Sequence, residues 1–179
     1  MNMKIATPLL LAGLLSSFST VSQAENSIYA GLAAGVSAYD YDDVDAGSAT
    51  KLFVGYKIDT NLAIEATFYD SGDADITSLP GLALNSDGLN VTAFYRANTS
   101  GNDLVAMIGG GIYNFDTTIK GPGGSISESS SGLSLAAGLE LGLTENLALR
   151  ADIDMFFGVK DFADNGNVDS IHIGVVLNF

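Results

Sequence analysis

Apolar side chains recur at every second position in eight stretches of this chain. The first is residues 27–39, where Ile28, Ala30, Leu32, Ala34 and Val36 alternate with small or aromatic residues. A period of two is typical of a β-strand, because successive side chains point to opposite faces. The same alternation recurs at residues 51–58, 62–69, 89–96, 104–113, 133–141, 147–156 and 170–179. These stretches predict an all-β fold of eight strands, most of about nine to twelve residues, the length that a tilted strand needs to cross a bilayer.

The connections between these strands alternate strictly between short and long. Residues 59–61, 98–102 and 144–146 are short turns, whereas 41–49, 70–86, 116–131 and 158–168 are longer, polar, and rich in Gly and Asp. Short periplasmic turns and long extracellular loops are typical of transmembrane barrels in the outer membrane. We therefore predict an eight-stranded antiparallel up-and-down transmembrane β-barrel, and we interpret residues 120–132 as a flexible extracellular loop.

The alternative is a soluble barrel such as a lipocalin, with its apolar face turned inward. The two faces of the predicted strands favour the membrane. One face is almost purely Leu, Ile, Val and Ala, and the other holds Gly, Ala, Ser, rings and a few charges, which suit a narrow, filled interior. Aromatic residues fall near the strand ends, as expected at bilayer interfaces. We place Tyr56, Tyr95 and Phe179 at the periplasmic rim and Phe68 and Phe157 at the outer rim.

Residues 1–24 have the pattern of a secretory signal peptide. Lys4 follows the start, residues 5–21 are largely apolar, and Ser22 and Ala24 are the small residues expected before cleavage. The alternative, a membrane anchor, is disfavoured by Pro8 and by four Ser and Thr residues in the apolar run. We expect residues 25–179 to form the barrel domain.

Charge and composition narrow the possible partners. The chain is 47% hydrophobic, has no cysteine and one histidine, and without the signal would carry six basic and 21 acidic residues. The resulting net charge of about −15 argues against nucleic acid, which needs a basic surface. We expect no cofactor and no metal site of the Cys/His type. Many of the acids lie in the long loops, which could bind a surface ligand or, as an alternative, a divalent cation bridging to lipopolysaccharide. The stretch DYDDVDAG (40–47) does not have the ligand spacing of an EF-hand.

Several charged residues share the inward face and need partners there, because an unpaired buried charge is very costly. Glu140 and Arg150 lie five residues to either side of the turn near Glu145, so they stand opposite each other. We predict an ion pair between them. We assign to an interior charge cluster Lys57, Glu65, Arg96, Glu140, Arg150 and Asp152.

The chain resembles a known family at three places. The last strand, HIGVVLNF, has His172, Gly174, Leu177 and Phe179 in a pattern similar to the signal by which bacterial outer-membrane proteins engage the barrel-assembly machinery. GYKIDTNLAIEATFYD (55–70) and GLELGLTENLALRADID (138–154) resemble hairpins of the transmembrane domain of outer membrane protein A and its relatives.

The resemblance implies a Gram-negative outer membrane, contact with its lipid and lipopolysaccharide, and periplasmic chaperones during biogenesis. It also implies an interior charge cluster at Glu65, Glu140 and Arg150 that plugs the lumen and has been proposed as a gate. The chain departs from the family where Phe94 replaces an inward lysine, with Arg96 two residues on, and where Met107 replaces an arginine. We expect no peptidoglycan-binding domain after Phe179.

We predict a structural or surface-interacting protein with a plugged lumen. The alternatives are a small channel of low conductance and a lipid-modifying enzyme. For the enzyme, Ser170 and His172 share one strand face, and Asp152 or Asp154 could orient the histidine. The polar position of the assembly signal explains His172 without catalysis, so we predict no catalytic residues.

Overall fold

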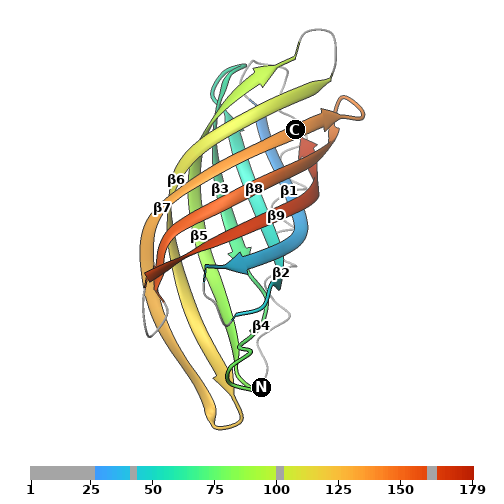
Figure 1. The fold of residues 1–179 in the computed structure, drawn as a ribbon. Helices are drawn as coiled ribbons and strands as arrows, with labels where there is room; N and C mark the ends of the chain where they lie inside the picture. Colours follow the sequence, from blue (N-terminus) through green and yellow to red (C-terminus); the bar gives the residue numbers. More distant parts are fainter. Residues whose placement is uncertain (1–26, 41–43, 100–102, 161–164) are drawn as a thin grey trace, which may run out of the picture.

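The computed structural model describes residues 27–40, 44–99, 103–160 and 165–179. Eight long strands and one two-residue strand follow one another along the chain (Figure 1). They are β1 (Ser27–Tyr39), β2 (Gly47–Lys57), β3 (Leu62–Asp70), β4 (Ala74–Asp75), β5 (Ala83–Asn98), β6 (Leu104–Gly121), β7 (Gly124–Gly142), β8 (Leu147–Lys160) and β9 (Asn165–Asn178). Among these described residues, no helix has the length and apolar character needed to cross a membrane. The proposed signal peptide lies outside the described residues.

The eight long strands close into an antiparallel barrel. Each strand pairs with its neighbours in the order β3-β2-β1-β9-β8-β7-β6-β5, and a further pairing of β3 with β5 joins the two ends. The short β4 pairs with the first two residues of β5, Ala83 and Leu84, at the extracellular end of that strand. The first and last strands pair from Tyr29–Asn178 to Tyr39–Val168. The predicted fold is confirmed, including the pairing that places the final strand against the first.

The two faces of the barrel separate as the alternation predicts. Large apolar side chains point outward and are exposed, for example Ile108 at 63%, Leu133 at 66% and Ile173 at 69%. Soluble monomers rarely expose a continuous apolar surface of this extent, whereas a bilayer requires one. Of the predicted rim aromatics, Tyr56, Tyr95, Phe68 and Phe157 are exposed on this outer face, and Phe179 is half-buried.

The prediction of a flexible loop at residues 120–132 is wrong. Strands β6 and β7 continue through this region and pair as far as Gly121 and Gly124, so they form a long hairpin with a two-residue turn. Figure 1 shows this hairpin reaching past the ends of the other strands, at the end of the barrel opposite the C-terminus. The many Gly and Ser residues suggest a loop, but the cross-strand Ile119–Ile126 pair and side-chain hydrogen bonds such as Thr118–Ser127 support a sheet.

The neighbouring strand does not follow this hairpin outward. Strand β7 pairs with β8 only between Gly142 and Leu133. Next to that point, Gly158 has a positive φ of 72° and the register of β8 shifts between Phe157 and Val159. A glycine in this conformation permits a bulge that bends the strand. Residues 124–132 of β7 pair with β6 on one side. On the other side, where β8 would lie, they have no strand partner within the described part of the chain.

Side chains fill the interior in layers. One apolar cluster lies toward the extracellular end and includes Tyr69, Phe115 and Phe156, and a second lies toward the periplasmic end and includes Tyr29 and Phe53. The large rings fit because facing positions are glycine. A Cβ atom at Gly55 would lie 2.0 Å from the Tyr29 ring, and one at Gly31 would lie 2.3 Å from the Phe53 ring. The charged side chains described below lie next to these clusters, since Tyr69 of the first contacts His172 and Phe53 of the second contacts Arg150.

Candidate functional site: the charged layer inside the barrel

Seven buried ionic side chains form a layer across the lumen. They come from five strands because inward positions at similar depth face one another across a narrow barrel. The cations are Lys51 on β2, Arg96 on β5 and Arg150 on β8, and the anions are Glu65 on β3, Glu140 on β7, and Asp152 and Asp154 on β8. The four anions exceed the three cations by one charge. His172 on β9, which is 1% exposed, lies in the same layer.

Arg150 is the centre of the first ion-pair group. Its guanidinium reaches across the barrel to Glu65, with Nη1 2.5 Å from Oε2, and its Nε lies 2.8 Å from Oδ2 of Asp152 on its own strand. The guanidinium carbon also lies 4.7 Å from the centre of the Phe53 ring, and the hydroxyl of Tyr29 donates to Glu65 at 3.0 Å. A buried charge with this many partners is held in one orientation.

Glu140 has a different partner from the predicted one. It stands opposite Arg150 in the register, as the sequence indicates, but its carboxylate binds Arg96 on β5, with Oε1 2.9 Å from Nη2. The predicted Glu140–Arg150 ion pair is therefore wrong. Arginine side chains are long enough to pass over the nearest cross-strand position, and each reaches an acid on a more distant strand. The Met107 sulfur accepts a hydrogen bond from Arg96 at 3.2 Å. Met107, at one departure from the resemblance described above, is therefore in contact with Arg96, which lies two residues after the other departure, Phe94.

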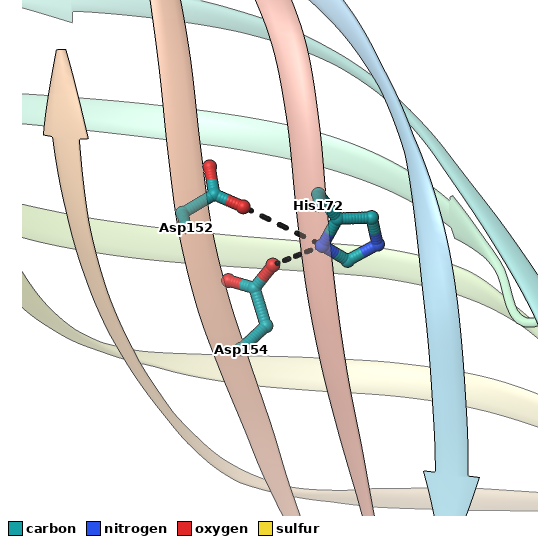
Figure 2. A group of neighbouring side chains, drawn as sticks. All are labelled: Asp152, Asp154 and His172. Carbon is teal, nitrogen blue, oxygen red and sulfur yellow. Dashed lines mark ion pairs between the residues drawn. The ribbon is translucent and has the colours of Figure 1, made fainter.

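Lys51 and His172 meet the two aspartates of β8. The Nζ atom of Lys51 lies 2.7 Å from Oδ1 of Asp152 and 2.7 Å from Oδ2 of Asp154. The Nδ1 atom of His172 approaches the same two oxygens, at 3.4 and 3.3 Å (Figure 2). These separations exceed those of charge-assisted hydrogen bonds, about 2.7–2.9 Å. Neither ring nitrogen of His172 has a hydrogen-bond partner among the described residues.

Lys57, which the sequence assigns to the same cluster, forms no ion pair with the other members among the described residues. Its ammonium donates to the side chain of Asn178 at 2.7 Å, near the periplasmic end, and lies 5.7 Å from the centre of the Tyr29 ring. The predicted cluster also omits Lys51 and Asp154. Both share the inward parity of the cluster, so the alternation alone could have included them.

The arrangement expected of a serine nucleophile is not formed. The hydroxyl of Ser170 is buried and has no hydrogen-bond partner among the described residues, and His172 turns Nδ1 toward the aspartates. A nucleophile needs its base within hydrogen-bond reach. The described geometry does not provide that contact.

The residues of the predicted assembly signal lie in the seam between the last and first strands. Gly174 stands opposite Ala33, where an added Cβ would lie 2.3 Å from the Leu32 carbonyl oxygen. Leu177 is exposed on the outer face, and the backbone N–H of Phe179 donates to Ile28 at 2.9 Å. These positions contribute to closure of the barrel as well as to the sequence pattern.

The extracellular end carries mostly acidic side chains. Asp70, Asp87 and Asp116 stand in one cross-strand row on the outer face, just beyond Phe68 and Leu89. Other described acids at this end are Asp40, Asp45, Asp73, Asp75, Glu128 and Asp169. Lys120 pairs with Asp73. Asp42, Asp43, Asp161 and Asp164, which the sequence also assigns to the long loops, lie outside the described residues.

Comparison with known proteins agrees with this architecture. A family model described as outer membrane protein beta-barrel domain matches residues 7–179. No curated protein sequence matches the chain. Among solved structures, Neisserial surface protein A is similar, with 16% identity, a TM-score of 0.70, and coverage of 87% of this chain and 98% of that one.

Two further solved structures have the same architecture. The N-terminal β-barrel domain of Pseudomonas aeruginosa OprF has 18% identity and a TM-score of 0.62, over 88% of this chain and all of that one. Ail, the attachment invasion locus protein of Yersinia pestis, in complex with the heparin analogue sucrose octasulfate, has 18% identity and a TM-score of 0.54, over 86% and 97% of the two chains. At sequence identities this low, the structural similarity shows a shared fold and no more.

Proposed function

Because the chain belongs to the outer membrane protein β-barrel domain family and lies in the Gram-negative outer membrane, we propose that it acts at the cell surface. In this proposal the barrel is an anchor with a plugged lumen. The part beyond the outer leaflet binds a partner. The export signal is residues 1–24, and the last strand, with His172, Gly174, Leu177 and Phe179, engages the assembly machinery during biogenesis.

The long β6–β7 hairpin is the observation that carries this proposal. It extends outward past β8, and residues 124–132 of β7 keep an unpaired backbone edge within the described chain. Natural proteins usually block such edges with Lys, Pro or an overlying segment, because an edge strand pairs readily with another chain. This edge has Glu128 as its one charged residue and no proline. Its exposed backbone favours binding of an extended peptide.

The interior argues against the channel alternative. Two apolar clusters and the paired charges next to them occupy the lumen. An eight-stranded barrel is just wide enough for side chains to fill. Opening a path would mean separating buried ion pairs, which is strongly destabilising. The lipid-modifying alternative has no support from the Ser170 and His172 geometry described above.

The charge of the outer face indicates the kind of partner. The Ail structure contains a heparin analogue, which is a polyanion. The acidic residues around the present hairpin would repel such a molecule, since like charges disfavour association. We therefore expect a cationic partner, such as a basic peptide segment.

Shortening the hairpin tests the surface role. Replacing residues 118–127 by Asn-Gly removes a segment bounded by the Thr118–Ser127 pair, so it keeps the register below it. The probes are immobilised polylysine and immobilised heparin, with refolded protein in detergent. The deleted segment contains one cation, Lys120, and no acid, so a loss of binding would report the backbone edge and not a loss of negative charge. We expect the full chain to bind polylysine in a salt-sensitive manner, the shortened chain to bind less because it lacks residues 124–127 of the edge, and neither to bind heparin. Equal binding by both chains, or binding to heparin, would contradict the proposal.

Single-channel recording of the refolded protein in a planar bilayer separates the plug from the channel. We expect no discrete conductance steps from the full chain or from the shortened chain. Reproducible steps whose size changes on substituting Glu65 would instead support the channel.

A further inference from the structure

We propose that Asp152, Asp154 and His172 form a binding site for a divalent transition metal, in which the Lys51 ammonium competes with the metal for the same two oxygens. Each of the three residues offers one ligand atom, and these atoms lie within 4.8 Å of one another. The absence of cysteine and the single histidine predict no metal site of the Cys/His type, and the site proposed here uses two aspartates with that histidine. This inference concerns the interior and is independent of the surface role proposed above.

Two of the three separations between the ligand atoms match those of a metal site, and the third, between the two carboxylate oxygens, is within 4.8 Å. Two ligands bound to a tetrahedral zinc ion at about 2.0–2.1 Å are about 3.3 Å apart. His172 Nδ1 lies 3.3 Å from Asp154 Oδ2 and 3.4 Å from Asp152 Oδ1. A combination of one imidazole nitrogen and carboxylate oxygens suits zinc, cobalt and similar ions.

His172 supplies a second, independent indication of a ligand. Its side chain is fully buried, and both ring nitrogens are without a hydrogen-bond partner in the described part of the chain. Figure 2 shows Nδ1 directed at the space between the two carboxylates. A buried imidazole left without hydrogen bonds is costly, and a bound metal would satisfy Nδ1.

The surroundings are built to hold these ligands in place. Asp152 presents Oδ1 to the site, and its Oδ2 forms an ion pair with Arg150 Nε at 2.8 Å that lacks hydrogen-bond geometry. Such outer contacts orient metal ligands and commonly change affinity by about 10–100-fold. The Tyr69 ring packs edge-on against the imidazole, with 5.7 Å between ring centres.

The chain supplies its own competing cation. Lys51 comes from β2, across the lumen, and its Nζ lies 2.7 Å from the two oxygens that face His172. All three ligands, in contrast, lie on the adjacent strands β8 and β9, with Asp152 directly opposite His172. The β8–β9 hairpin can therefore assemble the metal site locally, and Lys51 reaches it only when the barrel closes. Removing the Lys51 charge should free the Asp152 and Asp154 carboxylates to bind the metal, which should raise the metal affinity.

The test compares cobalt binding by lysine variants of the full chain, refolded in detergent and checked by its heat-dependent gel mobility. Co²⁺ is the probe because a tetrahedral site gives a visible absorption band, and Zn²⁺ should displace it. We expect Lys51→Met to bind one Co²⁺ per chain at least about tenfold more tightly than the wild type, because the competitor is gone. The matched control is Lys57→Met, which removes another inward lysine outside the site and should bind like the wild type.

Two further variants keep the outcome decisive. Adding His172→Gln to Lys51→Met should abolish the absorption band. If Lys51→Met does not fold, the wild type and His172→Gln alone are refolded with excess Co²⁺, and the metal that they retain is measured. We expect the wild type to retain more. The proposal is overturned if Lys51→Met binds no better than Lys57→Met, or if His172→Gln leaves binding or retention unchanged.

Discussion

Arg150 illustrates how single residues stabilise this interior. Its guanidinium contacts Glu65 and Asp152 and lies against the Phe53 and Phe94 rings, with 2% of its surface exposed. Taking charges out of water is expensive, so the contribution of such a group depends on its partners staying in place. The Arg150 side chain thus links four strands: β8, β3 through Glu65, β2 through Phe53, and β5 through Phe94.

Removing this fully buried charge should cost more than removing the half-buried charge of Lys57. Arg150→Met leaves Glu65 without its cation, and we expect the free energy of unfolding to fall by about 3–5 kcal/mol. Glu65→Gln added to Arg150→Met should recover part of the loss. Urea unfolding of the barrel in lipid vesicles gives these values. The control is Lys57→Met, for which we expect a loss below about 1 kcal/mol; equal losses for the two variants would contradict this assignment.

At the scale of elements, the seam between β1 and β9 decides whether the barrel closes. Gly35 stands opposite His172 and Gly174 stands opposite Ala33, so each strand contributes a glycine to the seam. A Cβ atom added to Gly35 would lie 1.7 Å from the Ile171 carbonyl oxygen, and one added to Gly174 would lie 2.3 Å from the Leu32 carbonyl oxygen. Close approach of two backbones is a recurrent use of glycine within strands.

Gly174→Ala tests this closure. The added methyl group would push the Leu32 carbonyl away, so we expect a smaller fraction of heat-resistant, fast-migrating barrel after refolding in detergent. Gly123→Ala is the matched control, because no atom lies within 4 Å of an added Cβ there. Refolding without the assembly machinery separates the two explanations of Gly174. If Gly174→Ala refolds as well as Gly123→Ala but is not assembled in cells, the glycine acts through recognition of the signal.

At the scale of the whole molecule, the outer membrane requires an apolar outer surface on the barrel and a fully paired backbone within the bilayer. The exposed Leu, Ile and Val side chains contact hydrocarbon, and in lipid every strand must be paired on both sides. The closed order of the eight long strands satisfies this requirement through the span of the barrel. Beyond the outer leaflet, where water can satisfy the backbone, residues 124–132 of β7 have no strand partner on the side away from β6 within the described chain.

Export to this membrane leads to a prediction for the whole chain. We expect protein from the outer-membrane fraction to begin at Glu25, because Ser22 and Ala24 are the small residues that signal peptidase requires. Intact-mass measurement gives the first residue directly. Ala24→Leu should cause the precursor to accumulate. A membrane-inserted chain that keeps Met1 would support the anchor alternative.

The chain sequence by itself determines the strands, their faces and the register of the short hairpins. Alternation fixes which side of each strand meets lipid, and short turns fix which residues stand opposite, as for Glu140 and Arg150. It also predicts which charges point inward. These features are local, because a strand has a period of two wherever it occurs.

Only the tertiary structure decided which interior charges meet and how far each strand continues. Arg96 reaches Glu140 and Arg150 reaches Glu65 because long side chains cross a narrow lumen, and their partners depend on barrel diameter and depth. Residues 120–132 form strand because β6 and β7 support each other there, although their composition favours a loop. The convergence of Lys51 with the β8–β9 residues likewise requires closure, since more than 100 positions separate it from its partners in the sequence.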